Sequence, residues 1–296
     1  MSAHTDSRPS EALPASPPAR PAATAVARTS FWASRRATIL LQILAGLIVL
    51  GIWQVAAEAA LVNPILLGKP SGIIVKIAGM LAGDTVYSRT IYDHLATSLQ
   101  VIILGYLLGS GIGILLGLAF GRSRPLRRIF EPLILAIASV PKIAIAPLFV
   151  IVLGIGASSR LAIVFIEVFF MVFFNTLRGV YEVNEEYVNI ARIMGASRWQ
   201  TLRRTVLPAA TPDIMLGLRL GVPFAITGAV LGEFIASNQG IGWLILYSSS
   251  SLDADGLWAA LVFLVATTWI LSLIIETIER RLLRWQPQRR EGSMQV

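Results

Sequence analysis

Long apolar runs separated by short polar segments dominate the chain from residue 38 onward. We expect six membrane-spanning helices, because each run is long enough to cross a bilayer. They lie at about 38–57, 95–120, 129–153, 161–177, 213–236 and 257–278. Segment 58–94 is expected to be a loop with short helical potential, and 237–256 a loop. The pattern predicts an all-α membrane protein.

Composition supports this class. Hydrophobic residues make up 55% of the chain, charged residues 14%, and the mean hydropathy is +0.70. The absence of cysteine excludes disulfides, thiol chemistry and iron–sulfur ligation. Two histidines leave little for a metal or haem site, so we expect neither. Residues 1–36 are predicted to be a disordered tail, 37–283 the membrane domain and 284–296 a basic tail.

The basic residues predict the orientation of the helices. With the N-terminus in the cytoplasm, segments 1–37, 121–128, 178–206 and 280–296 face inward and hold 19 of the 25 Lys and Arg residues. The outer segments hold four. Cytoplasmic loops are enriched in these residues, so both termini are expected to be cytoplasmic. The net charge of +8 is therefore a topology signal and does not indicate nucleic-acid binding.

Residues 184–208 form the only long charged segment enclosed by apolar spans. Its first half predicts a short amphipathic helix, capped by Asn184 and ended by Gly195. The apolar face of this helix is expected to carry Tyr187, Ile190, Ala191 and Met194. A cytoplasmic segment this structured and this charged is typical of a docking surface.

The second half of the segment predicts another short helix. Ser197 and Gln200 have the spacing of a capping box at its start. Pro208 is expected to end the helix, because proline lacks the backbone N–H that would continue it. The inner face is expected to hold Trp199, Leu202 and Val206.

This segment resembles the cytoplasmic EAA loop of bacterial ABC importer permeases. That loop has the pattern E-A-A, three residues, G, nine residues, I-x-L-P. The matching positions here are Asn189, Ile190, Ala191, Gly195, Thr205, Leu207 and Pro208. The spacing agrees throughout, whereas Asn189, Ile190 and Thr205 depart from the pattern. The resemblance implies that the following residues couple the chain to an ATPase: Asn189, Ile190, Ala191, Gly195, Ser197, Leu207 and Pro208.

Other stretches between residues 95 and 285 are similar to permeases that import sulfonates, taurine, nitrate and related small molecules. They are Val140-Pro141-Lys142, Ala146-Pro147-Leu148, Gly154-Ile155-Gly156, Phe173-Phe174-Asn175-Thr176, Leu218-Arg219, Glu233, Gly240-Ile241-Gly242 and residues 279–285. The resemblance implies the type I importer permease fold in a bacterial inner membrane. It also implies three kinds of partner: cytoplasmic ABC ATPases, an extracytoplasmic solute-binding protein and a second permease subunit, forming a homodimer.

Four ionisable residues lie inside predicted spans: Lys142, Glu167, Arg219 and Glu233. Charges at this depth are costly unless they are paired or face a cavity, so each is a candidate for the translocation path. Lys142 and Glu167 fall at similar depths on consecutive spans, which suggests an ion pair. Arg219 alternatively snorkels to the cytoplasmic interface, and Glu233 alternatively lies at the outer interface.

No phosphate-binding loop, metal-ligand cluster or catalytic constellation is evident in the sequence. We therefore expect a transport subunit that is not an enzyme and has no cofactor, with ATP bound by the partner ATPase. An ion-gradient-driven secondary transporter is the alternative, with Glu167 and Glu233 as proton or sodium sites. Against that alternative, the two halves of the sequence show no evident inverted repeat. A secondary transporter would also have no function for the charged segment 184–208.

Overall fold

The computed structural model describes residues 35–59, 61 and 63–283. The predicted tails 1–36 and 284–296 therefore lie, except for Arg35 and Arg36, outside the described residues. The chain divides into two compact units, residues 1–49 and 50–296. The described part of the first unit is residues 35–49, the first part of helix α1 (Arg35–Glu58).

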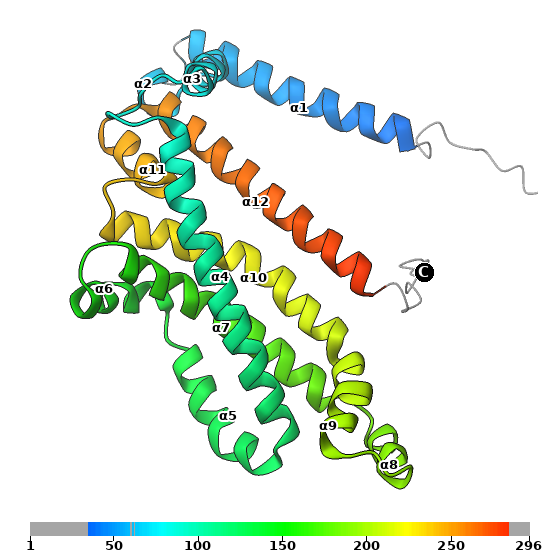
Figure 1. Cartoon of the computed structure of the whole chain (residues 1–296). Coiled ribbons are helices and arrows are strands. Elements are labelled where there is room, and N and C mark those ends of the chain that lie inside the picture. The colour runs from blue at the N-terminus through cyan, green and yellow to red at the C-terminus, as the bar shows by residue number, and fades with distance from the viewer. Residues whose placement is uncertain (1–34, 60, 62, 284–296) are drawn as a thin grey trace, which may run out of the picture. The chain divides into compact units, whose positions relative to one another are not determined.

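The second unit continues α1 and consists mainly of helices (Figure 1). Within the described residues there is no β-strand, only one isolated bridge between Val86 and Arg89. In order, the elements are α2 (Pro64–Leu67), α3 (Pro70–Ala82), α4 (Ile91–Arg122), α5 (Arg124–Ala138), α6 (Lys142–Leu153), α7 (Ala157–Tyr181), α8 (Glu185–Ile193), α9 (Arg198–Thr201), the π-helical turn η2 (Leu202–Val206), α10 (Leu207–Ala236), α11 (Ile241–Ser250) and α12 (Ala254–Leu282).

The predicted membrane spans correspond to observed helices. Among the residues that the structure describes, five helical stretches are long and apolar enough to cross a membrane, namely α1, α4, α7, the continuous helix Arg198–Ala236 and α12. The bent pair of α5 and α6 raises the number to six when it is counted as one span. The all-α membrane fold is therefore confirmed.

The third predicted span, 129–153, is not the single helix that we expected. It is two helices, α5 and α6, which meet at an angle of 90°. Pro132 and Pro147 lie inside these helices, and only Pro141 marks the break. Proline disfavours helical backbone at the residue before it and cannot donate a backbone hydrogen bond, which explains why the chain leaves the helix here.

The prediction of a loop at 237–256 is also wrong in part, because half of this segment forms α11. The hydrophobic side of α11 packs with α3 and α12 in a small core that includes Met80, Ile241, Leu244 and Ala259. The short helical potential of segment 58–94 is confirmed by α2 and α3.

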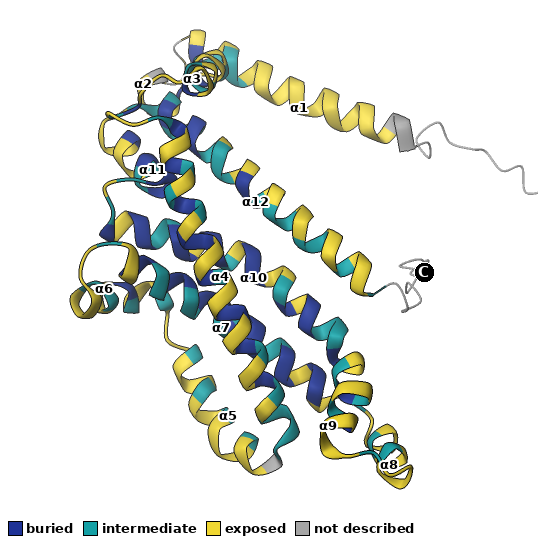
Figure 2. Ribbon diagram, viewed as in Figure 1, coloured by how far each residue is buried: buried dark blue, intermediate teal, exposed yellow. Residues whose placement is uncertain are grey.

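Helices α4, α7 and α10 form the main core of the second unit. Its buried residues include Val101 of α4, Val168 of α7 and Ala225 of α10. Figure 2 shows that buried residues concentrate along α7 and α10, whereas α5 is largely exposed. The many exposed leucines and isoleucines of the unit suit a lipid environment.

A stripe of glycines lets α4 approach α7 closely. A Cβ atom built on any of them would lie 2.5–3.1 Å from atoms of α7. These glycines are Gly105, Gly109, Gly113, Gly117 and Gly121. The four-residue repeat of small residues therefore serves tight helix packing.

Candidate functional site

The first part of segment 184–208 folds as the sequence predicts. The side chain of Asn184 accepts a hydrogen bond of 2.8 Å from the backbone N–H of Glu186 and so caps α8. Gly195 has a φ of +79°, in the left-handed region, and stops the helix. The N–H of Ala196 closes this end with a 3.0 Å bond to the carbonyl of Ala191.

The second part begins as predicted but continues further. Ser197 and Gln200 form the capping box of α9. The helix does not end at Pro208, since Arg198–Ala236 is continuous through η2. In this π-helical turn the N–H of Leu207 bonds the carbonyl of Leu202, five residues back. The wider turn accommodates the missing N–H and the bulk of the proline ring.

Apolar side chains of this segment point outward. Ile193 is 86% exposed, Met194 81% and Trp199 67%. Trp199 was expected on the inner face and is not there; Val206 is buried and Leu202 half-buried, as predicted. The inward contacts instead use Val180, Val206, Ala210 and Ile214, with Val183 and Val188 at the edge.

The residues at the EAA-loop positions are distributed over both faces. Asn189, Ile190, Gly195, Ser197 and Pro208 are exposed. Ala191 and Leu207 are half-buried. The segment therefore presents an exposed apolar surface, which consists of Tyr187, Ile190, Ile193, Met194 and Trp199. None of these side chains belongs to the buried cluster that packs the segment against the other helices.

The structure brings Lys142 and Glu167 together. The Lys142 Nζ atom lies 3.9 Å from Glu167 Oε2, and the side chains are 22% and 7% exposed. The hypothesised ion pair is therefore present. Its geometry differs from our depth argument, because Lys142 begins α6 after the 90° bend and does not lie within one continuous span.

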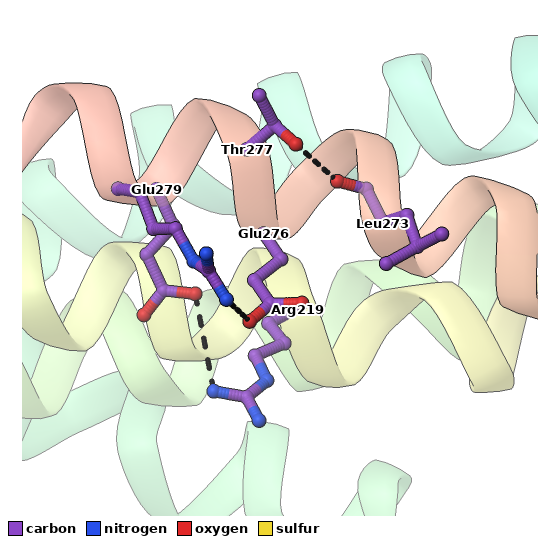
Figure 3. Close-up of polar contacts among 6 residues, drawn as sticks. Arg219, Leu273, Glu276, Thr277 and Glu279 are labelled. Carbon is purple, nitrogen blue, oxygen red and sulfur yellow. Dashed lines mark hydrogen bonds and ion pairs between the residues drawn. The ribbon is translucent and has the colours of Figure 1, made fainter.

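Arg219 lies on α10 and reaches toward α12, where its NH1 atom is 3.9 Å from Glu279 Oε2 (Figure 3). The Arg219 side chain is 60% exposed. Oε2 of Glu279 is buried and has no hydrogen-bond partner within the described chain. Arg280 bonds Glu276 on the same helix at 2.6 Å. Arg219 is thus held near the end of α12 that leads into the C-terminal segment.

Glu233 is 1% exposed, and both oxygens of its carboxylate are hydrogen-bonded. Its carboxylate accepts hydrogen bonds of 2.6 Å from the Ser98 hydroxyl and 2.6 Å from the backbone N–H of Gly242. Ser98 in turn accepts a 2.8 Å bond from the N–H of Ile241. Glu233 therefore anchors the start of α11 to α4 and α10.

Sequence reasoning missed two other buried polar residues at this end. His94 is completely buried, and its Nδ1 accepts a 3.1 Å bond from the N–H of Gly240. Arg160, counted in an outer loop, is 6% exposed and donates to the carbonyl of Gly156 and to Ser237. The four-residue spacing of His94 and Ser98 on an apolar helix was the available signal. Within the described residues, no group of three His, Asp or Glu side chains has the arrangement of a metal site.

Comparison with known proteins agrees with these features. The family model of the binding-protein-dependent transport system inner membrane component matches residues 109–285. The chain belongs to this family. The match runs from the middle of α4 past the end of α12 and includes the whole segment 184–208.

Two relatives of this permease are transport subunits. It is 31% identical to the taurine transport system permease protein TauC of Escherichia coli, over 85% of this chain and 91% of the relative. It is 27% identical to the putative aliphatic sulfonates transport permease protein SsuC of Bacillus subtilis, over 81% and 85%. Family membership favours an ABC importer permease over a secondary transporter.

The permease also shares its fold with a solved transporter. An inward-facing structure of the MetNI methionine ABC transporter aligns with a TM-score of 0.53 and 17% identity, over 69% of this chain and 95% of that chain. The type I importer permease fold expected from the sequence is confirmed.

Proposed function

We propose that this permease forms the membrane path of an ATP-driven importer for a small solute of the sulfonate, taurine or nitrate type. A solute-binding protein delivers the solute at the outer end, and a second copy of the permease completes the path. Separate ABC ATPase subunits bind at residues 184–208 and hydrolyse ATP. Both termini lie in the cytoplasm, as the distribution of basic residues indicates.

The observation that carries this proposal is the exposed apolar surface of 184–208. Ile193 and Met194 are 86% and 81% exposed, and Arg192 and Arg198 lie near them in the sequence. Such a surface on a segment expected in the cytoplasm favours burial in a partner protein. The basic neighbours favour acidic groups around the partner's groove.

The continuous helix Arg198–Ala236 supports a mechanism of coupling. Because no break separates α9 from α10, a displacement of the docked segment moves α10 directly. Helix α10 packs against α7, which carries Glu167, and a Cβ atom built on Gly228 of α10 would lie 3.3 Å from Glu167 Cγ. Movement at the ATPase thus reaches the charged pair in the membrane through one helix.

The test is co-purification in mild detergent. Wild-type permease should retain a stoichiometric ATPase subunit, whereas Ile193→Glu and Met194→Glu should lose it while folding normally, because both side chains are exposed. Ile74→Glu is the matched control, since Ile74 is 66% exposed on α3, away from this segment.

Two results would contradict the proposal. One is a wild-type permease that purifies alone and moves solute in liposomes with only an ion gradient. The other is retention of the ATPase by both glutamate variants at the wild-type ratio, which would place the docking surface elsewhere.

A further inference from the structure

A polar cavity of about 710 Å³ lies between α3, the turn that follows it and the start of α12. This is the end of the molecule that is expected outside. The volume is in the range of pockets that bind small organic groups. The charged side chains of its lining are Lys69, Lys76, Asp84 and Asp255, two of each sign. The importer mechanism proposed above gives this cavity no role.

Lys69 and Asp255 lie side by side at one end of the cavity. The Asp255 Oδ1 atom accepts a 3.0 Å hydrogen bond from the backbone N–H of Lys69. Within the described residues, however, the Lys69 ammonium makes no hydrogen bond or ion pair, and Asp255 Oδ2 accepts no hydrogen bond. Lys76, by contrast, is paired with Asp253 at 2.8 Å. Lys69 and Asp255 therefore offer one free cation and one free carboxylate oxygen to a ligand.

The loop before α3 is shaped around the Asp255 carboxylate. A Cβ atom on Gly72 would overlap Asp255 Oδ2, and one on Gly68 would lie 2.8 Å from Oδ1. The indole N–H of Trp258 donates a 2.9 Å bond to the carbonyl of Leu67 and fixes the same loop to α12. The position of the carboxylate in the cavity is thus set by backbone contacts.

Aromatic side chains indicate that the cavity lies at the level of the lipid headgroups. Trp53 and Trp258 pair edge to face with ring centroids 5.2 Å apart, and Tyr87 of the cavity lies 3.9 Å from the ring of Tyr247. Tryptophan and tyrosine are enriched at the membrane–water interface. Figure 1 shows α3 nearly end-on while α12 runs across the view, so α3 lies across the end of the spanning helices.

The rim of the cavity is apolar and exposed. Val75 lines the cavity and is 71% exposed, and its neighbour Ile74 is 66% exposed. Helix α2, which directly precedes this site, carries Ile65 and Leu66, which are 60% and 66% exposed. A polar cavity with an apolar rim at this level suits an amphipathic ligand, whose polar group enters while its hydrocarbon stays outside.

The charges of the cavity favour one kind of headgroup. A phosphate accepts charge-assisted hydrogen bonds from the Lys69 ammonium, and a primary ammonium donates them to Asp255 Oδ2. An anionic headgroup without an ammonium would bring a like charge toward Asp255. A choline headgroup carries methyl groups where N–H donors are needed.

We propose that this cavity binds the phosphoethanolamine headgroup of a membrane phospholipid, with the phosphate at Lys69 and the ammonium at Asp255. The bound lipid bridges the start of α3 and the start of α12 and so fastens the outer end of the permease to the bilayer. This site goes beyond the importer function and does not depend on the ATPase.

The test is native mass spectrometry of the full-length permease, purified in detergent and titrated with single lipids. The probes are three dioleoyl phospholipids whose headgroups carry ethanolamine, choline or glycerol. Wild-type protein should bind the ethanolamine lipid at least about fivefold more tightly than the other two, because only this lipid supplies both a phosphate and N–H donors. Soluble glycerophosphoethanolamine should bind at least about tenfold more weakly than the lipid, because it makes no contact with the apolar rim.

Variants assign the two halves of the headgroup. Asp255→Asn keeps an acceptor for the Lys69 N–H and should bind the ethanolamine and choline lipids within about twofold of each other. Asp253→Asn is the matched control, since Asp253 also begins α12 but points to Lys76, and it should keep the wild-type preference. Lys69→Met should weaken all three lipids about equally, because each carries a phosphate, whereas Arg89→Met should not.

Equal affinity of wild-type protein for the three lipids would overturn the inference, as would an unchanged ethanolamine preference in Asp255→Asn. Binding of glycerophosphoethanolamine as tightly as the lipid would show that the ligand is a soluble phosphate ester and would overturn the assignment to the membrane. Failure of the proposed function is seen separately, as a wild-type permease that purifies without an ATPase, and leaves these lipid affinities unaffected.

Discussion

Gly240 and Gly242 lie where a buried carboxylate leaves no space for a side chain. A Cβ atom on Gly240 would come within 2.3 Å of the Glu233 carboxyl carbon, and one on Gly242 within 2.9 Å of both the carboxylate and the Val230 Cα atom. The Gly-Ile-Gly run thus follows from the close approach of Glu233 to the start of α11, and nucleotide binding is not needed to explain it.

Gly242→Ala should destabilise the permease by about 1–3 kcal/mol, because the added methyl group overpacks a site bounded by backbone. The measurement is the thermal unfolding midpoint of the detergent-solubilised protein. Gly111→Ala on α4 is the control: nothing lies within 4 Å of its added Cβ atom, and alanine favours a helix. Equal midpoints for the two variants would show that Glu233 tolerates displacement.

At the scale of elements, a partly buried ion pair joins α3 to the start of α12. Lys76 Nζ lies 2.8 Å from Asp253 Oδ2, and Asp253 also accepts a 2.9 Å bond from the N–H of Gly256 to cap α12. Partial burial raises the pKa of Asp253, but the hydrogen bonds from Lys76 and Gly256 outweigh this and leave the pKa below its ordinary value of 3.8.

Because the pKa of Asp253 is lowered by folding, its ionised form stabilises the folded state above the ordinary pKa. That stabilisation is lost as the pH falls through the lowered pKa of the folded protein. Asp253→Asn keeps the cap and removes the charge. It should cost about 1 kcal/mol or less at pH 7, since Lys76 is partly exposed.

The difference in unfolding midpoint between wild type and Asp253→Asn should shrink when both are measured at pH 3. Lys76→Met is the companion variant and should reduce the same pH dependence, since it removes the cation. A difference that stays constant from pH 7 to pH 3 would mean that the ion pair does not stabilise this junction.

At the scale of the whole molecule, the distribution of basic residues predicts which end faces the cytoplasm. The bias of Lys and Arg predicts that α8 and the start of α5 lie inside, and that α3 and α11 lie outside. The chain has no cysteine, so single introduced thiols report their own position.

In right-side-out membrane vesicles, a membrane-impermeant maleimide should label Ser251→Cys and leave Arg128→Cys unlabelled until the membrane is opened. Both residues are exposed in the structure. The physical reason is the positive-inside bias, which retains arginine-rich segments in the cytoplasm. The opposite labelling pattern would reverse the topology and remove the proposed ATPase surface from the cytoplasm.

Features coded by short-range chemistry were predictable from the sequence alone. The caps at Asn184 and Ser197, the stop at Gly195 and the glycine stripe of α4 depend on residues a few positions apart, or on one face of one helix. The same holds for the apolar spans, because a run of about 20 apolar residues requires a bilayer whatever its neighbours are.

The tertiary structure decided what depends on residues distant in sequence. The helix continues through Pro208 because the π-helical turn before it accommodates the proline ring. Helix α11 forms because Glu233, Ser98 and His94 accept hydrogen bonds from the backbone at its start. Trp199 is exposed because the inner face is already filled by Val206 and its neighbours. The periodicity of the sequence identifies which residues share a face of a helix. Only the packing of the other helices determines which face is buried.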